Sequence, residues 1–280
     1  MIIDVHTHLF AADVRQNREH YFSAEPAFRL LYESPKSKIV SAEETISAMD
    51  EDGVDVSVIF GFPWKNIDTA RRNNDAVADA VARHPGRLVG FCCLDPASDG
   101  ADKEAERCLD AGLAGVGELA FYGSGIGESA LDRLSPLMAL CREREVPVMI
   151  HTNEPVGHRY PGKTPNTLAE IYRLVTRFSE NRIILAHWGA GLFFYTLLKK
   201  EVSESLRNVW VDTAASPFLY RPEIYALAAR LFGVEKILFG TDFPLLRPGR
   251  YFQEIAESGI SDDDRKSILG DNARRLLGIG

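Results

Sequence analysis

The sequence has few of the features that mark secreted or membrane proteins. It contains only four cysteines in 280 residues, and their spacing matches neither a disulfide framework nor a zinc motif. No apolar run approaches the roughly 20 residues that a membrane-spanning helix requires. Polar side chains interrupt the first apolar run at Asp4 and His6, unlike a secretory signal. We therefore expect a cytoplasmic protein with reduced, mostly buried thiols and no membrane partner.

Positive charge is also scarce. The chain has 32 Lys and Arg against 40 Asp and Glu, which gives a net charge of -8. A protein that binds nucleic acid needs a basic face, so this balance argues against a nucleic-acid partner. It excludes no small molecule. We expect a small-molecule substrate, and a homo-oligomer is compatible with the sequence.

Short, continuous apolar runs recur along the whole chain. Continuous runs, in place of alternating ones, indicate strands that are buried on both faces, as in parallel sheets. The eight expected strands span residues 2–6, 54–62, 87–94, 113–119, 146–151, 182–187, 208–214 and 236–243.

Helical patterns separate these runs. Ser41 and Glu44 have the spacing of a capping box, and Gly53 stands where that helix should end. A later helix is expected to begin at Ser135 and Pro136. Apolar residues at three- and four-residue spacing indicate further helices in residues 74–86, 167–181 and 222–233.

Strands that alternate with helices predict an α/β fold with a parallel sheet. A doubly wound sheet usually carries a glycine fingerprint after its first strand, and "HTHLFAAD" contains no glycine. An eight-stranded (β/α) barrel, the TIM barrel, typically has about 250 residues, which suits this chain. We predict a single-domain TIM barrel over residues 1–280. Its first connection, residues 10–38, is an aromatic-rich insertion that we expect to cover the barrel mouth.

Polar side chains gather at the ends of the expected strands. A closed barrel points all the carboxyl ends of its strands at one central volume, and barrel enzymes carry their chemistry there. Four of the seven histidines and two carboxylates fall at these ends. They are His6 and His8 at the end of the first strand, Glu118 at the end of the fourth, His151 at the end of the fifth, His187 at the end of the sixth and Asp242 at the end of the eighth.

These six residues make a donor set for a divalent cation. His6 and His8 lie two residues apart on a strand, so they face the same way and can bind one ion. Imidazoles with carboxylates suit zinc first, with manganese, iron, cobalt and nickel as alternatives. Each of these residues, taken alone, could have an ordinary structural role. A metal site would be excluded only if all six had such roles independently. Asp212 lies earlier in its strand, and we expect it to be structural.

The motifs together resemble a known superfamily. "DVHTHLF", "GELAFY", "MIHTNE", "LAHWGAG" and "LFGTDFP" are similar to the metal-dependent amidohydrolase superfamily. The resemblance is strongest to its amidohydrolase-related branch, which includes aminocarboxymuconate-semialdehyde decarboxylase and related TIM-barrel hydrolases. It extends to "GDNARRLLG" near the end of the chain.

The resemblance implies roles for the candidate residues. His6, His8, His151 and Asp242 match metal ligands, and His187 matches a histidine that either binds a second ion or polarises substrate or water. Glu118 resembles the strand-four glutamate of TatD-type deoxyribonucleases, where it is a metal ligand. No lysine follows the fourth strand, where a carbamylated bridging ligand would be expected. We expect one or two metal ions, with Glu118 among the ligands.

The leading functional hypothesis is a metal-dependent hydrolase that cleaves an amide, ester or lactone bond of a small molecule. The cation would lower the pKa of a bound water toward about 7. Asp242 would accept the proton of that water, and His187 would stabilise the developing oxyanion. The alternatives are non-oxidative decarboxylation of a small unsaturated or aromatic acid, cleavage of a phosphodiester, and a metal-binding barrel without catalysis.

Two loops are candidates for substrate contact. Phe62 and Trp64 follow the second expected strand. The loop after the fifth strand supplies His158, Arg159, Tyr160 and Lys163. The alternative is that both loops pack on themselves and do not contact a substrate.

Overall fold

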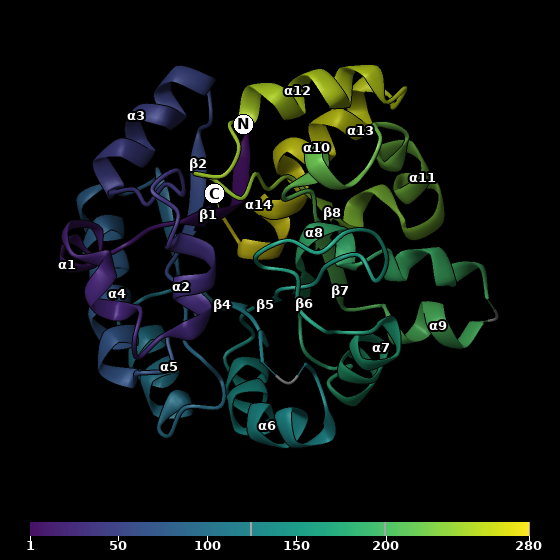
Figure 1. Ribbon diagram of the computed structural model, residues 1–280. Coiled ribbons are helices and arrows are strands. Elements are labelled where there is room, and N and C mark those ends of the chain that lie inside the picture. Colours follow the sequence, from purple (N-terminus) through teal and green to yellow (C-terminus); the bar gives the residue numbers. More distant parts are fainter. Residues whose placement is uncertain (124, 199, 280) are drawn as a thin grey trace.

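A parallel β-barrel forms the centre of the molecule (Figure 1). The computed structural model describes residues 1–123, 125–198 and 200–279. Hydrogen bonds from the Val5 amide to the Phe239 carbonyl and from the His8 amide to the Phe243 carbonyl, both 2.8 Å, join the last strand to the first. The predicted TIM barrel is thus confirmed. In sheet order, the strands are β1 (Ile3–His8), β2 (Val56–Phe60), β3 (Leu88–Cys92), β4 (Gly115–Leu119), β5 (Val148–Ile150), β6 (Ile183–Leu185), β7 (Val209–Asp212) and β8 (Ile237–Leu238).

Helices surround the barrel, as Figure 1 shows. The longer helices are α3 (Ala42–Asp52), α4 (Ile67–Arg83), α5 (Ala101–Asp110), α6 (Glu128–Glu143), α7 (Leu168–Arg177), α11 (Glu223–Phe232) and α12 (Pro248–Glu257). The shorter ones are α1 (Ala12–Gln16), α2 (Pro26–Tyr32), α8 (Ala186–Gly189), α9 (Lys200–Ser205), α10 (Ser216–Leu219), α13 (Asp262–Lys266) and α14 (Asn272–Leu277). Single turns are η1 (Arg18–Tyr21), η2 (Leu192–Leu197), η3 (Val234–Lys236) and η4 (Ser267–Asp271).

Local sequence signals place some helix ends correctly and one wrongly. The capping box of α3 is present, with Ser41 and Glu44 each accepting the other's backbone N–H, and Gly53 ends the helix at φ 73°. The expected start at Ser135 and Pro136 is wrong, because α6 begins eight residues before Pro136, at Glu128. The first turns of α6 bury apolar side chains, and this burial extends the helix beyond its apparent start.

The core has two parts. Inside the barrel, apolar side chains of alternate strand positions fill the cylinder, as in other barrels of this size. A larger cluster lies between the strands and the surrounding helices. Strands buried on both faces explain why their sequences are continuous apolar runs. Among the described residues, no helix is both long and apolar enough to cross a lipid bilayer.

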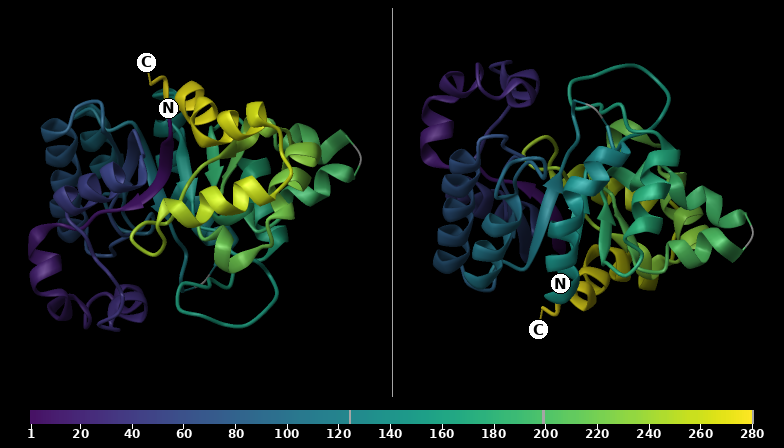
Figure 2. Two further views of the ribbon diagram at one scale, coloured as in Figure 1. Left: turned by 90° about the horizontal axis from the view of Figure 1, so that it is seen from above. Right: turned by 90° about the horizontal axis from the view of Figure 1, so that it is seen from below.

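The two ends of the barrel differ in what covers them. Both termini lie at one end, and Figure 2 shows the insertion (purple) and the loop after β5 (teal) at the other. This second end is where the strands terminate, so the insertion lies at the mouth end, although to one side of the barrel and not over its centre as we expected. Phe28 of the insertion packs on Trp64, with ring centroids 4.5 Å apart, and on Phe62 at 5.5 Å.

Candidate metal centre

The six candidate residues meet at the carboxyl ends of the strands. Their nitrogen and oxygen donors form three overlapping groups, each with all atoms within 4.8 Å of one another. Their roles as ligands and catalysts stay predictions, but the structure brings all six together. The groups are His6, His8 and Glu118; His6, His187 and Asp242; and Glu118, His151 and His187.

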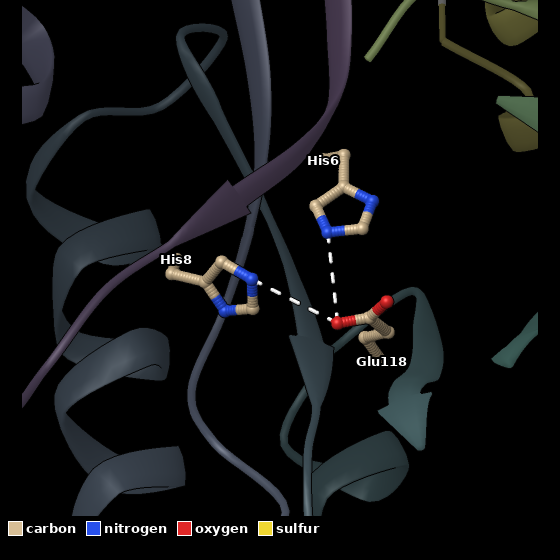
Figure 3. A group of neighbouring side chains, drawn as sticks. All are labelled: His6, His8 and Glu118. Carbon is tan, nitrogen blue, oxygen red and sulfur yellow. Dashed lines mark ion pairs between the residues drawn. The ribbon is translucent and has the colours of Figure 1, made fainter. Parts of the chain in front are cut away.

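Glu118 lies at the centre of the cluster and divides its two oxygens between two pairs of histidines. Its Oε2 is 3.6 Å from His6 Nε2 and 3.8 Å from His8 Nε2, as Figure 3 shows. Its Oε1 is 2.8 Å from His151 Nδ1 and 3.3 Å from His187 Nε2. This carboxylate, at the end of β4, therefore connects side chains from three other strand ends, those of β1, β5 and β6.

The residue before Glu118 has to be glycine. Gly117 has φ 129°, in the region that favours glycine, and a Cβ atom there would lie 2.4 Å from the carbonyl oxygen of Met149 on β5. The close approach of β4 to β5 at this point holds Glu118 beside His151. The motif "GE" thus has a steric reason as well as a chemical one.

Asp242 completes the first histidine pair. Its Oδ1 is 3.2 Å from His8 Nε2 and 3.7 Å from His6 Nε2. With 17% of its side chain exposed, Asp242 is the most accessible of the six, because the others are 0% to 10% exposed. Among these residues, Asp242 is the one that a molecule in the mouth reaches most easily.

An unusual backbone turn delivers His187. His187, Trp188, Gly189 and Ala190 all have φ between 56° and 62°, a left-handed run that residues with side chains seldom adopt. The segment labelled α8 is therefore a left-handed turn. Buried hydrogen bonds hold it: His187 Nδ1 lies 3.0 Å from the Ala214 carbonyl, and the Trp188 indole donates to a serine hydroxyl at 3.0 Å.

Charges in the cluster stabilise one another. Burial on its own would raise the pKa of Glu118, but the charges on His151 and His6 outweigh it and hold this pKa well below its ordinary value. Burial would lower the pKa of His6, yet the Glu118 carboxylate helps to raise it well above its ordinary value. Burial also opposes protonation of His187, and its hydrogen bond to Glu118 still raises the pKa to about 9. The buried carboxylates thus favour positive charge among the imidazoles.

The cluster fits a divalent cation. His6 Nε2 is fully buried and, among the described residues, has no hydrogen-bond partner, although it faces the Glu118 and Asp242 carboxylates at 3.6 and 3.7 Å. A buried polar atom without a partner is costly, and coordination to a cation would satisfy it. Imidazoles and carboxylates are also the donors that such metals bind.

A seventh strand-end residue, Asp212, also contacts the cluster. Its carboxylate lies 2.9 Å from His6 Nδ1, although we expected a structural role. The available signal was its place at the end of β7, where a carboxylate can reach the same central volume as the other strand ends.

The loop residues proposed for substrate contact mostly bond to their own surroundings. Trp64 is completely buried against the insertion. In the loop after β5, Lys163 and Tyr160 both bond to the Glu154 carboxylate at 2.8 Å, while Arg159 is exposed. Packing within the loops, the alternative explanation, accounts for Trp64, Tyr160 and Lys163.

One aromatic side chain does touch the cluster. Tyr122, three residues beyond β4, has its ring centroid 5.7 Å from that of His151. Its other neighbour is Phe62, whose ring is nearly parallel at 9° and 6.0 Å away. These rings form a flat wall beside the histidines.

Fold, donor set and sequence together define the class. The chain belongs to the amidohydrolase family, whose model matches residues 3–279. It is 25% identical to 2-amino-3-carboxymuconate-6-semialdehyde decarboxylase of Dictyostelium discoideum over 99% of this chain and 91% of the relative. It is also 25% identical to gamma-resorcylate decarboxylase of Polaromonas sp., over 86% and 89% respectively.

A solved structure confirms the shared fold. The 5-carboxyvanillate decarboxylase of Novosphingobium aromaticivorans, complexed with manganese and 4-hydroxy-3-methoxy-5-nitrobenzoic acid, superposes with a TM-score of 0.78 at 15% identity. The match covers 100% of this chain and 96% of that one.

These relatives correct the leading functional hypothesis. We expected hydrolysis of an amide, ester or lactone, and the curated relatives that align along most of the chain are decarboxylases instead. The expectation of a hydrolase is therefore wrong. The error has a chemical cause: a cluster of imidazoles and carboxylates around a cation can serve either reaction, and the residue types alone do not separate them.

Proposed function

We propose that this chain is a metal-dependent, non-oxidative decarboxylase of a small aromatic or unsaturated carboxylic acid. The observation that carries the proposal is the buried cluster of four imidazoles and two carboxylates, in a chain that aligns end to end with a decarboxylase. The alternative, a barrel that binds metal but catalyses no reaction, is distinguished from a decarboxylase by the activity test below.

We propose that all six clustered residues form the ligand set for one or two divalent cations. The position of Glu118 favours two ions over one, because its two carboxylate oxygens face separate pairs of histidines. The histidines favour zinc, whereas the Novosphingobium structure contains manganese, so elemental analysis decides between these metals. When bound, the cation supplies positive charge that polarises the carboxylate or a neighbouring oxygen of the substrate.

Asp242 is the proposed proton-transfer residue. Decarboxylation breaks the bond between a carbon and its carboxylate, releases carbon dioxide and leaves the electron pair on that carbon, which takes up one proton. Burial would raise the pKa of Asp242, but its hydrogen bond to His8 and the neighbouring imidazole charges lower it, so Asp242 is ionised at rest. The proton therefore comes from solvent and passes to the substrate through Asp242, the most exposed carboxylate of the cluster. With two ions bound, His187 Nε2 is a ligand of the second; with one ion bound, the same atom is placed to stabilise negative charge on a substrate oxygen.

The wall beside the cluster supports a flat substrate. The Tyr122 ring lies next to His151, and the buried Phe62 ring is nearly parallel to that of Tyr122. Aromatic side chains favour stacking with planar groups. A planar aromatic or conjugated acid would lie against this wall with its carboxylate toward the histidines.

The test is release of labelled carbon dioxide. Protein loaded with Mn²⁺ or Zn²⁺ is incubated with carboxyl-labelled gamma-resorcylate, 5-carboxyvanillate and related conjugated acids, with and without chelator. We expect metal-dependent release from at least one acid. No release from any acid while the metal stays bound would contradict the proposal and favour a non-catalytic barrel.

Asp242→Asn tests the assigned proton transfer. Because general acid catalysis typically contributes about 10²- to 10⁴-fold, we expect a loss of this size in kcat. Asp50→Asn is the matched control, since Asp50 is exposed and pairs with Arg87 on the surface. Full turnover in Asp242→Asn would remove the role.

We also propose a cytoplasmic location and a small-molecule partner. All four cysteines are free and buried, as expected for a reducing compartment. Fractionation of the source cells would test the location.

A further inference from the structure

Asp212 makes three hydrogen bonds in a fully buried position at the end of β7. Its Oδ1 accepts the backbone N–H groups of His187, at 2.8 Å, and of Ala214, at 3.0 Å. Its Oδ2 lies 2.9 Å from Nδ1 of His6. One carboxylate therefore contacts two of the six clustered residues, one through its ring and one through its backbone.

The bond to His6 determines which ring nitrogen is available. An ionised carboxylate only accepts hydrogen bonds, so Nδ1 of His6 carries the hydrogen and donates it to Asp212. In the neutral ring, the form that coordinates a cation, Nε2 is then the nitrogen with a lone pair. It is the atom that faces Glu118 and Asp242 and that has no hydrogen-bond partner among the described residues.

The bond to His187 supports the left-handed turn. His187 is the first residue of this turn, and its φ of 56° is unfavourable for a residue with a side chain. Asp212 accepts that N–H and also the N–H of Ala214, whose carbonyl lies 3.0 Å from His187 Nδ1. The carboxylate thereby ties the end of β7 to the turn that places the His187 ring.

We propose that Asp212 is a positioning residue that presets His6 and His187 for a divalent cation. The proposal rests on the metal site proposed above. A carboxylate that orients a ligating histidine typically contributes about 10- to 100-fold to metal affinity.

Asp212→Asn separates this role from a structural one. The asparagine oxygen has to stay with the N–H groups of His187 and Ala214, so its NH₂ group faces His6 Nδ1. Two donors cannot pair, and the His6 ring relieves the conflict when Nδ1 becomes the acceptor and Nε2 carries the hydrogen. An Nε2–H cannot coordinate a cation, while the packing of the side chain is almost unchanged.

Asp4→Asn is the matched control. Asp4 is another buried carboxylate, near the start of β1, and its Oδ1 accepts the backbone N–H groups of His6 and Thr241, each at 3.0 Å. Its Oδ2 accepts the Thr241 hydroxyl, which can turn to accept from an asparagine. Asp4 bonds to the backbone of His6, whereas Asp212 bonds to the ring.

The experiment is a titration with Mn²⁺, followed by the electron paramagnetic resonance signal of the free ion. We expect the Kd of Asp212→Asn to rise about 10- to 100-fold and that of Asp4→Asn to stay at the wild-type value. Equal affinity of wild type and Asp212→Asn would overturn the role of Asp212 and leave the metal site standing. A wild-type protein that binds no Mn²⁺ would overturn the metal site as well.

A second measurement does not depend on the folding of a variant. In wild-type protein loaded with Zn²⁺, nitrogen NMR of the histidine rings should show His6 with hydrogen on Nδ1 and metal on Nε2. Coordination through Nδ1, or no hydrogen on Nδ1, would refute the proposal.

Discussion

Glu25 fastens the aromatic insertion to the barrel, and its removal should loosen that insertion selectively. The side chain is 2% exposed, directly before α2. Its two oxygens accept the backbone N–H groups of Lys65, at 3.1 Å, and of Asn66, at 2.8 Å, in the connection between β2 and α4. These bonds hold the insertion against the segment that carries Trp64.

Glu25→Gln keeps one acceptor and replaces the other with an NH₂ group, so one of these partly buried N–H groups loses its charged acceptor. A hydrogen bond to a charged group contributes about 1.5–3 kcal/mol, which corresponds to about a 10- to 150-fold increase in local opening when it is lost. Hydrogen exchange followed by mass spectrometry should show this increase in residues 10–38 and in residues 65–66.

Glu33→Gln provides the control for this change. Glu33 lies in the same insertion but is exposed and pairs only with Arg29 on the surface. We expect the hydrogen exchange of residues 10–38 to be unchanged in Glu33→Gln, since exposed ion pairs contribute little to stability. Unchanged exchange in Glu25→Gln as well would refute the idea that this carboxylate fastens the insertion.

Three further predictions concern stability. Ser41→Ala removes the cap of α3 and should cost about 1 kcal/mol, seen by calorimetry as a fall of about 2 °C in Tm; an unchanged Tm would contradict the capping box. Burial would raise the pKa of Glu104, but its hydrogen bonds to Arg107 and Asn74 hold this pKa below 4.5. The ionised carboxylate therefore stabilises the fold fully above pH 4.5, and this stabilisation is lost as the pH falls through the lowered pKa. Glu104→Gln should therefore be less stable to urea by about 1.5–3 kcal/mol at pH 7, with a smaller difference below pH 4.5, and a constant difference would refute this. Chelation should lower Tm by about 4–5 °C relative to protein with metal at 100 times its Kd, because that excess adds about 2.7 kcal/mol to a 280-residue chain; an identical Tm would argue against a bound cation.

The parts of the fold that follow from local sequence were predictable. Continuous apolar runs gave the parallel strands, and their number and alternation with helices gave the barrel. The capping box of Ser41 and Glu44 marks the start of α3 because its two hydrogen bonds form within four residues. The placement of the six clustered side chains follows from the same regularity, since barrel closure brings all strand ends together.

Features that depend on distant partners could not be predicted in this way. Pro136 follows a serine, as at a helix start, yet it lies inside α6 because burial of Leu131 and Leu134 favours a longer helix. Asp212 contacts a ring 206 residues away in sequence; its place at the end of β7 puts it near the mouth, but only the folded barrel shows which ring it meets. The left-handed turn at His187 is likewise held by bonds from β7 and its loop.

The choice between hydrolysis and decarboxylation was beyond the sequence for a different reason. His6, His8 and Asp242 supply donors for a cation in either reaction, so the donor set defines the metal chemistry and leaves the substrate open. That choice depends on the groups that bind the substrate, such as Tyr122, which lies against His151 at the end of "GELAFY" but to which the motif alone assigned no role.

The most direct test of the central claim is a crystal structure of the protein soaked with Mn²⁺, with anomalous diffraction to locate the metal. The account predicts an anomalous peak enclosed by His6, His8, Glu118 and Asp242, with His6 coordinated through Nε2. A folded protein at saturating Mn²⁺ with no peak between these side chains would contradict it.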